Sequence, residues 1–530
     1  MSASTISPRR AFTSLALVVS ALSVTACSGF SASGSSGESS PGPARGDDAG
    51  TPAPHAPIIT GTPDKSELNE AFGVFVAPKG QPESAGTREH PLATIQAGID
   101  LGKRLGKRVY VCTGTFQEAL VLADSISIIG GLDCSGSEWR IGAAHTRIEA
   151  PTSPAVRAKN IVAATRLEGL DIVAPSATEP AGSSIGLLAD HAAAVVIAGS
   201  QITAGDGANG VNGTEGVQLA QTGSINGAPT VVEGQCRNGD TCTFVAGNGW
   251  LKPAGAAGGT SSCAGAPGHI GLSGGNGGSG GLYSSVRPAG SGWVWHYYGE
   301  SASFAPEYGQ DRDRTAPKTG ASGTPSSAIG SLSSEGYVVA SSGVAGTDGA
   351  PGNGGFGGRG SAPTTDPGPV PTNDVWRGAG GPGGGGGGCP GLAGTAGTGG
   401  GASIALALID SPVVIDGTQL VAGRGGAGGH GTFGSDPTAG GAAGTNAVAD
   451  SAVAARSGQN GASPGISTNG SSGPSVGVMH SGAAPTLRGS AKITPGPSGA
   501  AIDERSHEAF GNTRTIPATP TGIRKDILAL

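Results

Sequence analysis

Four stretches of this chain, far apart in the sequence, repeat one pattern, and this repeat constrains the fold more than any other feature. Each copy contains two short runs of alternating apolar residues joined by a few polar or small ones, the pattern of strands with one buried face. The copies cover residues 155–172, 184–205, 403–423 and 475–493. Because so short a unit cannot bury its own apolar face, we expect the copies to stack on one another as a solenoid.

The two best-matched copies are 184–205 and 403–423. Both begin with Ser-Ile-x-Leu and continue with Gly-[Ser/Thr]-Gln-[Ile/Leu] at nearly the same spacing, although almost two hundred residues separate them. The sequence therefore predicts that these copies stack directly, with the intervening residues looped out. Four apolar residues are expected to point inward in register. They are Ile185, Leu187, Ile404 and Leu406.

The N-terminus predicts an exported, membrane-anchored protein. Arg9 and Arg10 precede an apolar run that is too short to span a bilayer, and the run ends in Val24-Thr25-Ala26-Cys27. This ending resembles the bacterial lipobox, which implies a signal peptide at 1–26, lipid on Cys27 and, from Ser28, sorting to the outer membrane, on its cell-surface or its periplasmic face. An ordinary signal peptide with a chance cysteine is the alternative. The Arg pair also resembles a twin-arginine signal, so the export route stays open.

Composition narrows the class further. Residues 27–63 are mostly Ser, Gly, Pro, Ala and Thr, which predicts a lipidated, disordered tether. No transmembrane helix follows in the sequence, so we expect anchoring without spanning. Glycine accounts for 101 of 530 residues, against about 7 per cent in ordinary proteins, which excludes a helical fold and favours an all-β one. A net charge of -7 without a basic run argues against nucleic acid as a partner.

Seven cysteines in an exported chain predict disulfides, because six remain once Cys27 is assigned to lipid. Fifteen pairings are possible. Cys236 and Cys242 flank a hairpin-turn sequence, Cys112 and Cys134 each end a predicted strand, and Cys263 and Cys389 then pair by elimination. The chain has no Cys-x-x-Cys sequence, so we expect neither a metal nor another cofactor.

The segment before the repeats carries a family resemblance. Three runs, 73–80, 86–100 and 109–118, resemble the entry module of right-handed parallel β-helix proteins, the pectin-lyase-like superfamily. The second run holds Gly-Thr-x-x-x-Pro-x-x-Thr-Ile-Gln, and the third ends in Gly-Thr-Phe-x-Glu. The resemblance spans about 73–205, resumes in the later copies, and implies a helix over the open end of the solenoid. Three residues give that helix an apolar stripe: Ile95, Ile99 and Leu105.

Two long Gly-rich insertions, 206–402 and 424–474, leave the solenoid after equivalent strands. Glycine recurs in them in short triplets, and ordering so many glycines is entropically costly. Extended helices with three residues per turn, packed side by side, would supply the backbone hydrogen bonds that offset this cost. Mobile low-complexity loops are the alternative.

The chain is thus predicted to contain nine parts. They are the signal peptide 1–26, the tether 27–63, a capping module with the first coils 64–150, coils 151–205, the insertion 206–402, a coil 403–423, the insertion 424–474, C-terminal coils 475–516 and a tail 517–530.

The first insertion is unusually rich in aromatics, the densest cluster being Trp293, Trp295, Tyr297 and Tyr298. Exposed Trp and Tyr offer flat apolar faces with polar edges, which suit sugar rings. These aromatics are therefore candidate ligand-binding residues. A small local core beneath the Gly-rich loops is the alternative.

The sequence contains no recognisable constellation of residues for acid–base catalysis. Gly429-His430-Gly431 matches one polygalacturonase element, but the accompanying elements of that family are missing. Four carboxylates lie singly on or beside the repeats: Asp171, Asp190, Asp410 and Asp416. The sequence thus favours a non-catalytic cell-surface lipoprotein that displays Gly-rich loops for adhesion or contact with polysaccharide or extracellular matrix. The alternative is a surface-tethered polysaccharide lyase or glycoside hydrolase.

Overall fold

The structure, a computed structural model, describes most of the chain after residue 61. It describes residues 62–136, 138–230, 254–264, 272–279, 315–325, 329–340, 342–361, 379–446 and 454–530, and the backbone of five short strands at 244–245, 249–250, 282–286, 294–296 and 375–377. Every described residue lies within His55–Leu530.

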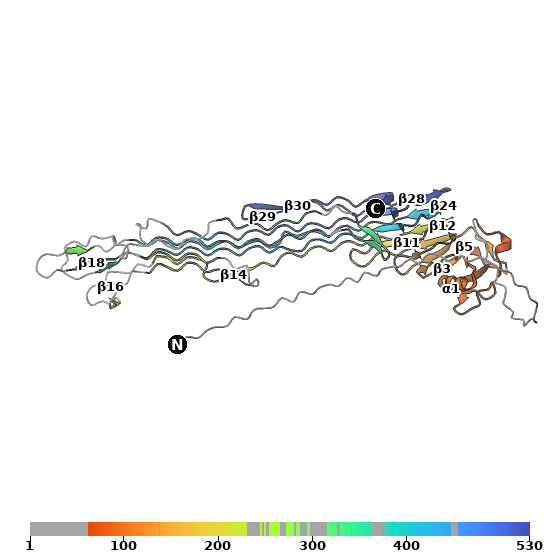
Figure 1. Cartoon of the computed structure of the whole chain (residues 1–530), viewed down its shortest axis with the longest axis horizontal. Helices are drawn as coiled ribbons and strands as arrows, with labels where there is room; N and C mark the ends of the chain where they lie inside the picture. Colours follow the sequence, from red (N-terminus) through yellow and green to blue (C-terminus); the bar gives the residue numbers. More distant parts are fainter. Residues whose placement is uncertain are drawn as a thin grey trace, which may run out of the picture. The chain divides into compact units, whose positions relative to one another are not determined.

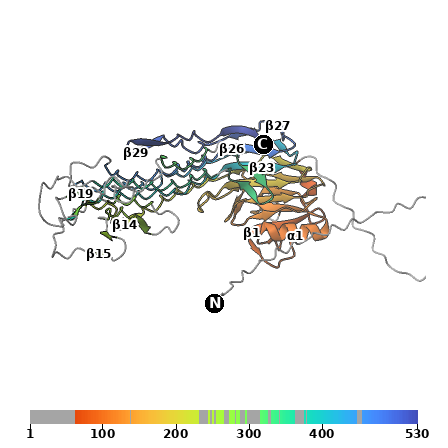
Figure 2. The same cartoon turned by 60° about the vertical axis from the view of Figure 1, so that its left-hand side comes forward.

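Three parallel sheets dominate the described residues, so the all-β expectation is confirmed (Figures 1 and 2). Sheet A contains, in spatial order, β1 (Gly73–Gln81), β2 (Arg108–Cys112), β5 (Ile128–Asp133), β9 (Thr165–Glu168), β12 (Val195–Ala198), β24 (Val414–Asp416) and β27 (Thr486–Arg488); β6 (Arg140–Ile141) pairs antiparallel with β5. Sheet B contains β3 (Gly114–Phe116), β7 (Thr146–Glu149), β10 (Leu170–Val173), β13 (Gln201–Thr203), β25 (Gln419–Val421) and β28 (Lys492–Thr494). Sheet C contains β4 (Leu120–Val121), β8 (Val156–Lys159), β11 (Ser184–Asp190), β23 (Ser403–Ile409), β26 (Ser475–Ser481) and β31 (Arg524–Ala529).

From β8 to β28 the chain visits the sheets in a fixed order. Each pass adds one strand to sheet C, one to sheet A and one to sheet B, and the sequence copies described above are these passes. The pass that ends at β13 and the pass that begins at β23 stack directly, with Ser184 paired to Ser403 and Gln201 to Gln419. The predicted register across the long insertion is therefore confirmed.

The core between the sheets is built from columns of aliphatic side chains, one per pass. On sheet B the column is Ile148, Ile172, Ile202 and Leu420, paired in register and each 0 % exposed. Burial of one such side chain contributes about 1.5–3 kcal/mol, so every added pass extends the core.

The inward prediction for sheet C is half right. Leu187 and Leu406 belong to the main core, but Ile185 and Ile404 belong to a second apolar cluster. At Gly186 a Cβ would lie 2.4 Å from Ile202 Cγ2, so position 186 faces the core as well as its neighbour Leu187. Two successive inward positions break the strict alternation. Ile185 is therefore placed with the outer cluster.

Helix α1 (Ile95–Leu105) packs against β1 and β2 at the end of the sheets opposite β27 (Figure 2). Thr94 caps it, accepting the amide of Ala97, and Gly106 ends it in the left-handed conformation at φ 65°. Ile95 and Ile99 are buried as expected, but Leu105 is 48 % exposed, so its assignment to the apolar stripe is wrong. Gly98 and Gly102 complete the buried face instead.

The last residue of the Gly-Thr-Phe-x-Glu run, Glu118, has a structural role at this helix. Its carboxylate oxygens accept the amides of Ile95 and Gln96 at 2.7 and 3.0 Å, two of the first amides of the helix that have no partner within it. Burial nevertheless raises the pKa of Glu118 above its ordinary value, and the two backbone hydrogen bonds only partly oppose this effect. The run and the helix are therefore one structural unit.

Glu118→Gln should destabilise the protein by about 1 kcal/mol, the usual cost of a lost helix cap. Because the folded-state pKa is raised, the stabilising contribution of Glu118 is largest below pH ~4.5 and declines as the pH rises through the folded-state value. Denaturation midpoints across this range should thus show the wild-type advantage shrinking with rising pH. The exposed Glu179→Gln serves as control, and an advantage that grows with pH contradicts this assignment.

The Gly-rich residues form extended segments hydrogen-bonded side by side, here called the Gly-rich bundle (Figure 1). Its segments are 205–217, 223–230, 254–260, 272–279, 315–325, 342–361, 379–402, 423–446 and 454–474. Hydrogen bonds recur at every third residue: the amides of residues 207, 210 and 213 donate to the carbonyls of residues 424, 427 and 430. This period is that of the extended three-residue helix. For the described residues, it favours ordered packing over mobile loops.

Segment 379–402 is the centre of the bundle. The backbone amides of Gly383 to Gly388 all donate to other segments. Their acceptors lie in 223–230, 272–279 and 454–474, in an order that repeats every three residues. Carbonyls of the same stretch accept from three further segments, namely 254–260, 342–361 and 423–446. Backbone thus surrounds the stretch, and a Cβ would lie within 2.1 Å of a backbone oxygen at five of the six consecutive glycines, all except Gly386. The peripheral segment 205–217 has glycine only at every third position from 207.

The C-terminal region differs from the predicted coils and tail. Residues 505–516 form an antiparallel hairpin of β29 (Arg505–Ala509) and β30 (Asn512–Ile516), which lies along the bundle. Asp436 of the bundle accepts hydrogen bonds from His507 and Arg514, and the guanidinium of Arg505 lies 5.5 Å from the ring centroid of Phe433. The region predicted as a tail contains β31, which extends sheet C beside β26.

Candidate binding surfaces

The predicted binding aromatics lie largely outside the described residues. Trp293, Tyr297 and Tyr298 are outside them, and Trp295 lies on β19 (Val294–His296), whose backbone is described. Strand β19 pairs antiparallel with β18 (Leu282–Val286), which also pairs with β22 (Val375–Arg377). Trp295 lies opposite Ser285, and Trp376 lies opposite Tyr283. The register thus places three aromatic positions in one small sheet.

The position of this small sheet follows from the chain path. Strand β22 precedes segment 379–402, which runs extended to β23 of sheet C. At about 3.1 Å per residue, that segment separates β22 from sheet C by roughly 70 Å. A further short hairpin, β15 (Phe244–Val245) with β16 (Gly249–Trp250), pairs Phe244 with Trp250. Figure 1 labels β16 and β18 at the end of the bundle away from sheet C.

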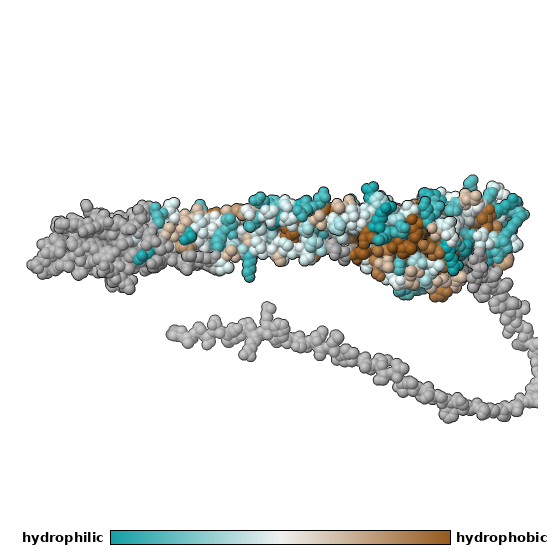
Figure 3. Space-filling model, turned by 90° about the horizontal axis from the view of Figure 1, so that it is seen from above, coloured by the Kyte–Doolittle hydropathy of each residue, from teal (hydrophilic) through white to brown (hydrophobic). Residues whose placement is uncertain are grey.

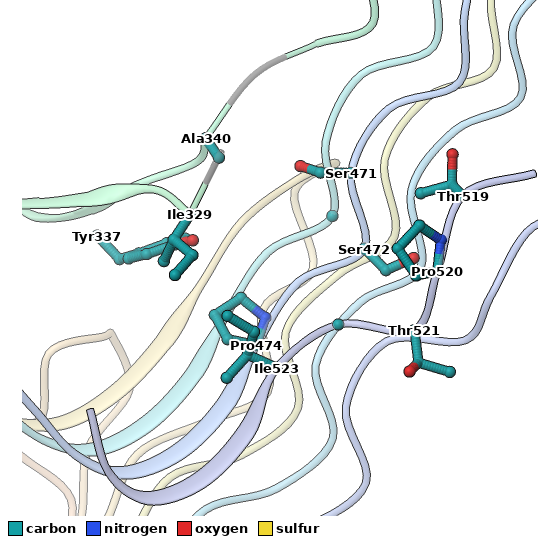
Figure 4. Close-up of a pocket in the computed structure, with 12 residues that line it drawn as sticks. Ile329, Tyr337, Ala340, Ser471, Ser472, Pro474, Thr519, Pro520, Thr521 and Ile523 are labelled. Carbon is teal, nitrogen blue, oxygen red and sulfur yellow. The ribbon is translucent and has the colours of Figure 1, made fainter. Parts of the chain in front are cut away.

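A pocket that no sequence pattern indicated lies where the bundle meets sheet C (Figure 4). One wall comes from the antiparallel hairpin β20 (Ser331–Ser333) and β21 (Gly336–Val338), with Tyr337 and the nearby Ile329. The other walls come from Ser471, Ser472 and Pro474 and from residues 519–523, among them Pro520 and Ile523. Its volume is about 140 Å³. The pocket is thus large enough for a single ring-sized group.

The hairpin is held over the outer face of sheet C. Leu332 and Tyr337 pack against the outer cluster that contains Ile185 and Ile404. From β8, the Arg157 guanidinium donates to the carbonyls of the turn residues Ser334 and Glu335, at 2.9 and 3.3 Å. The hairpin therefore covers an apolar surface and at the same time builds the pocket.

The chemistry of the pocket is apolar with hydroxyl groups. Isoleucine and proline side chains form the apolar part, and four hydroxyl residues join them: Ser471, Ser472, Thr519 and Thr521. Burial raises the pKa of Tyr337, so its phenol is protonated at neutral pH, and its oxygen accepts the amide of Gly330 at 3.0 Å. No carboxylate, lysine or arginine is among the described lining residues, so the pocket suits an uncharged ligand.

Of the four carboxylates singled out in the sequence, Asp171 and Asp190 form ion pairs with an arginine or a lysine. Arg147 pairs with Asp171 at 2.6 Å and with Glu149 at 2.7 Å, and these interactions raise the pKa of the guanidinium. Asp416 lies on β24, where its register partner is Arg488 of the next pass. Among the main pockets formed by the residues that the structure describes, none is lined by Asp171 or Asp416.

Asp190 is the last residue of β11 and Asp410 directly follows β23, and their carboxylates flank the His191 side chain. The imidazole Nδ1 lies 2.6 Å from Asp190 and Nε2 lies 3.8 Å from Asp410, while Lys159 lies 3.7 Å from Asp190. The turns that follow the stacked strands of sheet C each have one residue in the left-handed conformation at the equivalent position. These residues are Asn160, His191, Asp410 and Gly482, with φ values of 55°, 52°, 44° and 80°. These groups thus hold stacked turns together. The described residues contain no cluster of three or more His, Cys, Asp or Glu that could hold a metal ion.

The Gly429-His430-Gly431 sequence has a packing explanation. A Cβ on Gly429 would lie 1.9 Å from the carbonyl oxygen of Val211, and one on Gly431 would lie 2.0 Å from that of Ser467. The His430 amide donates to Asn212 Oδ1 at 2.8 Å. The bundle therefore requires both glycines, whatever residue stands between them.

The structure contains two of the predicted disulfides. Cys112 joins Cys134 at the ends of β2 and β5, and Cys263 of β17 (Ser262–Ala264) joins Cys389 in the bundle, each with a Cα separation of 5.8 Å. Strand β17 pairs with β14 (Ala220–Thr222) beside this second bridge. Cys27, Cys236 and Cys242 lie outside the described residues.

Comparison of the chain with protein-family models, with curated proteins and with solved structures finds no match. Within the residues that the structure describes, no helix combines the length and hydrophobicity needed to cross a bilayer.

Proposed function

We propose that this protein is a non-catalytic lipoprotein of the cell surface that presents binding groups on a rigid, Gly-rich arm. In this proposal the three parallel sheets are a right-handed parallel β-helix of the pectin-lyase-like type. Lipid on Cys27 anchors the chain to the outer membrane, and residues 28–63 are the tether. The N-terminal sequence and the Gly-Thr-Phe-x-Glu run support these assignments.

The order of the Gly-rich bundle is the observation that carries the proposal. Mobile loops would need no regular backbone pairing, whereas this bundle satisfies consecutive amides at every position of its central stretch. Ordering so many glycines has a large entropic cost. A bundle that holds binding groups at a fixed distance from the sheets would account for that cost. Strands β18, β19 and β22, which contain the aromatic positions, are joined to sheet C through segment 379–402 and are separated from it by that distance.

The ligand class that fits best is a neutral polysaccharide. Tryptophan and tyrosine positions in the small sheet suit the apolar faces of sugar rings. The uncharged, hydroxyl-lined pocket beside β21 offers a second site for one ring. A lyase or hydrolase would instead need converging carboxylates in a groove, and Asp171 and Asp190 are engaged in ion pairs.

Binding of the full chain to immobilised neutral polysaccharides should fall about tenfold when Trp295 and Trp376 are both replaced by alanine, because ring stacking is lost. Phe510→Ala is the matched control, since Phe510 is an exposed aromatic on the β29–β30 turn. Equal loss in the control, or release of new reducing ends or unsaturated sugars by the wild type, contradicts the proposal.

A further inference from the structure

The two ends of the parallel sheets are unlike each other. At the first end, α1 lies over β1 and β2. At the other end, β27, β28 and β31 are the last strands of sheets A, B and C, and no described strand pairs with their outer edges. These three strands are here called the C-terminal edge. Unpaired strand edges are ready templates for pairing with another chain.

The core columns continue into the C-terminal edge and are exposed there. Leu487 pairs with Ile415 and Ile527 pairs with Val478, and both inner partners are 0 % exposed. Leu487 itself is 45 % exposed and Ile527 is 38 % exposed, because no further pass covers them. Figure 3, seen from above, shows hydrophobic residues gathered where Figure 1 places the C-terminus and β28.

Positively charged residues lie on the same strands as these apolar residues. Arg488, Lys492 and Lys525 are exposed on the three strands, and none forms an ion pair with another described residue. Asp526 is the one carboxylate side chain on these strands. A cationic edge is unusual in a chain whose net charge is -7.

We propose that the C-terminal edge is a docking site for an acidic, apolar segment of a partner protein, which adds a strand and closes the core. A strand that alternates apolar and acidic residues matches this edge. Its backbone would pair with the free edge groups, its apolar side chains would cover the exposed core positions, and its carboxylates would face the basic side chains. A polysaccharide would leave the apolar positions uncovered. A second copy docked edge to edge would bring Arg488, Lys492 and Lys525 against their own equivalents, which is unfavourable.

The test uses the full chain and two labelled peptides, one alternating Glu and Val and the other alternating Lys and Val. The Glu-Val peptide should bind at least about tenfold more tightly, and added salt should weaken it. Reversing the three cations (R488E, K492E, K525E) should invert the preference between peptides. Leu487→Asn with Ile527→Asn should weaken binding about tenfold, whereas Val162→Asn, at a 76 % exposed site elsewhere, should not.

Circular dichroism and melting curves first establish that each variant folds. Equal binding of the two peptides, or no inversion by the charge-reversed variant, overturns the proposal. Self-association of the wild type in sedimentation that Leu487→Asn with Ile527→Asn abolishes would show that the occupant is a second copy. Binding of polygalacturonate at this edge without binding of the Glu-Val peptide would also overturn it.

Discussion

Gly387→Ala is expected to unfold the Gly-rich bundle far more readily than the wild type. A Cβ at this position would lie 1.8 Å from the carbonyl oxygen of Gly352 and 2.4 Å from its carbonyl carbon. Both atoms belong to backbone that is itself hydrogen-bonded, so no side-chain rotation can relieve the overlap. We expect a loss of at least ~3 kcal/mol, the upper end of the range for overpacked cores.

The effect should spread through the bundle because the central stretch contacts six other segments. Thermal unfolding and amide exchange of residues 342–361 and 379–402 would measure it. Gly136→Ala is the matched control, because a Cβ there meets nothing within 4 Å. If the two alanine variants have the same stability, the side-by-side packing of the segments is wrong.

Loss of the Cys263–Cys389 disulfide should have the second-largest effect. The bridge joins residues 126 apart in sequence, and a disulfide that closes a loop of this order stabilises by about 2–5 kcal/mol. Both cysteines are buried, with Leu219 beside them, so the bridge also fixes β17 to the centre of the bundle. The double variant Cys263→Ser with Cys389→Ser should melt earlier and lose amide protection in 254–264.

The Cys112–Cys134 bridge provides the comparison, because it closes a shorter separation of 22 residues at the end of β2 and β5. Its double serine variant should lose protection in sheet A and leave the bundle unchanged. If removal of either bridge has the same effect on both regions, the bundle and the sheets do not respond as separate parts.

The sequence predicted the stacking well because the pattern that encodes it is local. Each pass carries its own apolar alternation, so the register of Ser184 with Ser403 followed from the matching copies despite the insertion between them. The capping helix was recognisable for the same reason, since Thr94, Ile95 and Ile99 lie within one short run. Its end was less predictable: Leu105 has a suitable spacing but lies in the last turn, beyond the packed face.

What could not be predicted depends on contacts between distant segments. Ile185 faces outward because Gly186 fits against Ile202, a contact that strand alternation does not reveal. The pocket arises because a hairpin within the first insertion returns to sheet C. The sequence suggested side-by-side packing of extended Gly-rich helices, but not which segments of the two insertions contact one another. In the structure, segment 379–402 of the first insertion is hydrogen-bonded to segments of the second. Removal of either insertion would therefore leave backbone amide donors of the other without acceptors.

Hydrogen–deuterium exchange of the peptide covering residues 379–391 tests the central claim most directly. The claim is that the Gly-rich insertions form an ordered, hydrogen-bonded bundle. It predicts that the amides of Gly383 to Gly388 exchange as slowly as those of β11 and β23, since each donates to a neighbouring backbone. Exchange of this peptide at the rate of an unstructured chain, with β11 and β23 still protected, would contradict it.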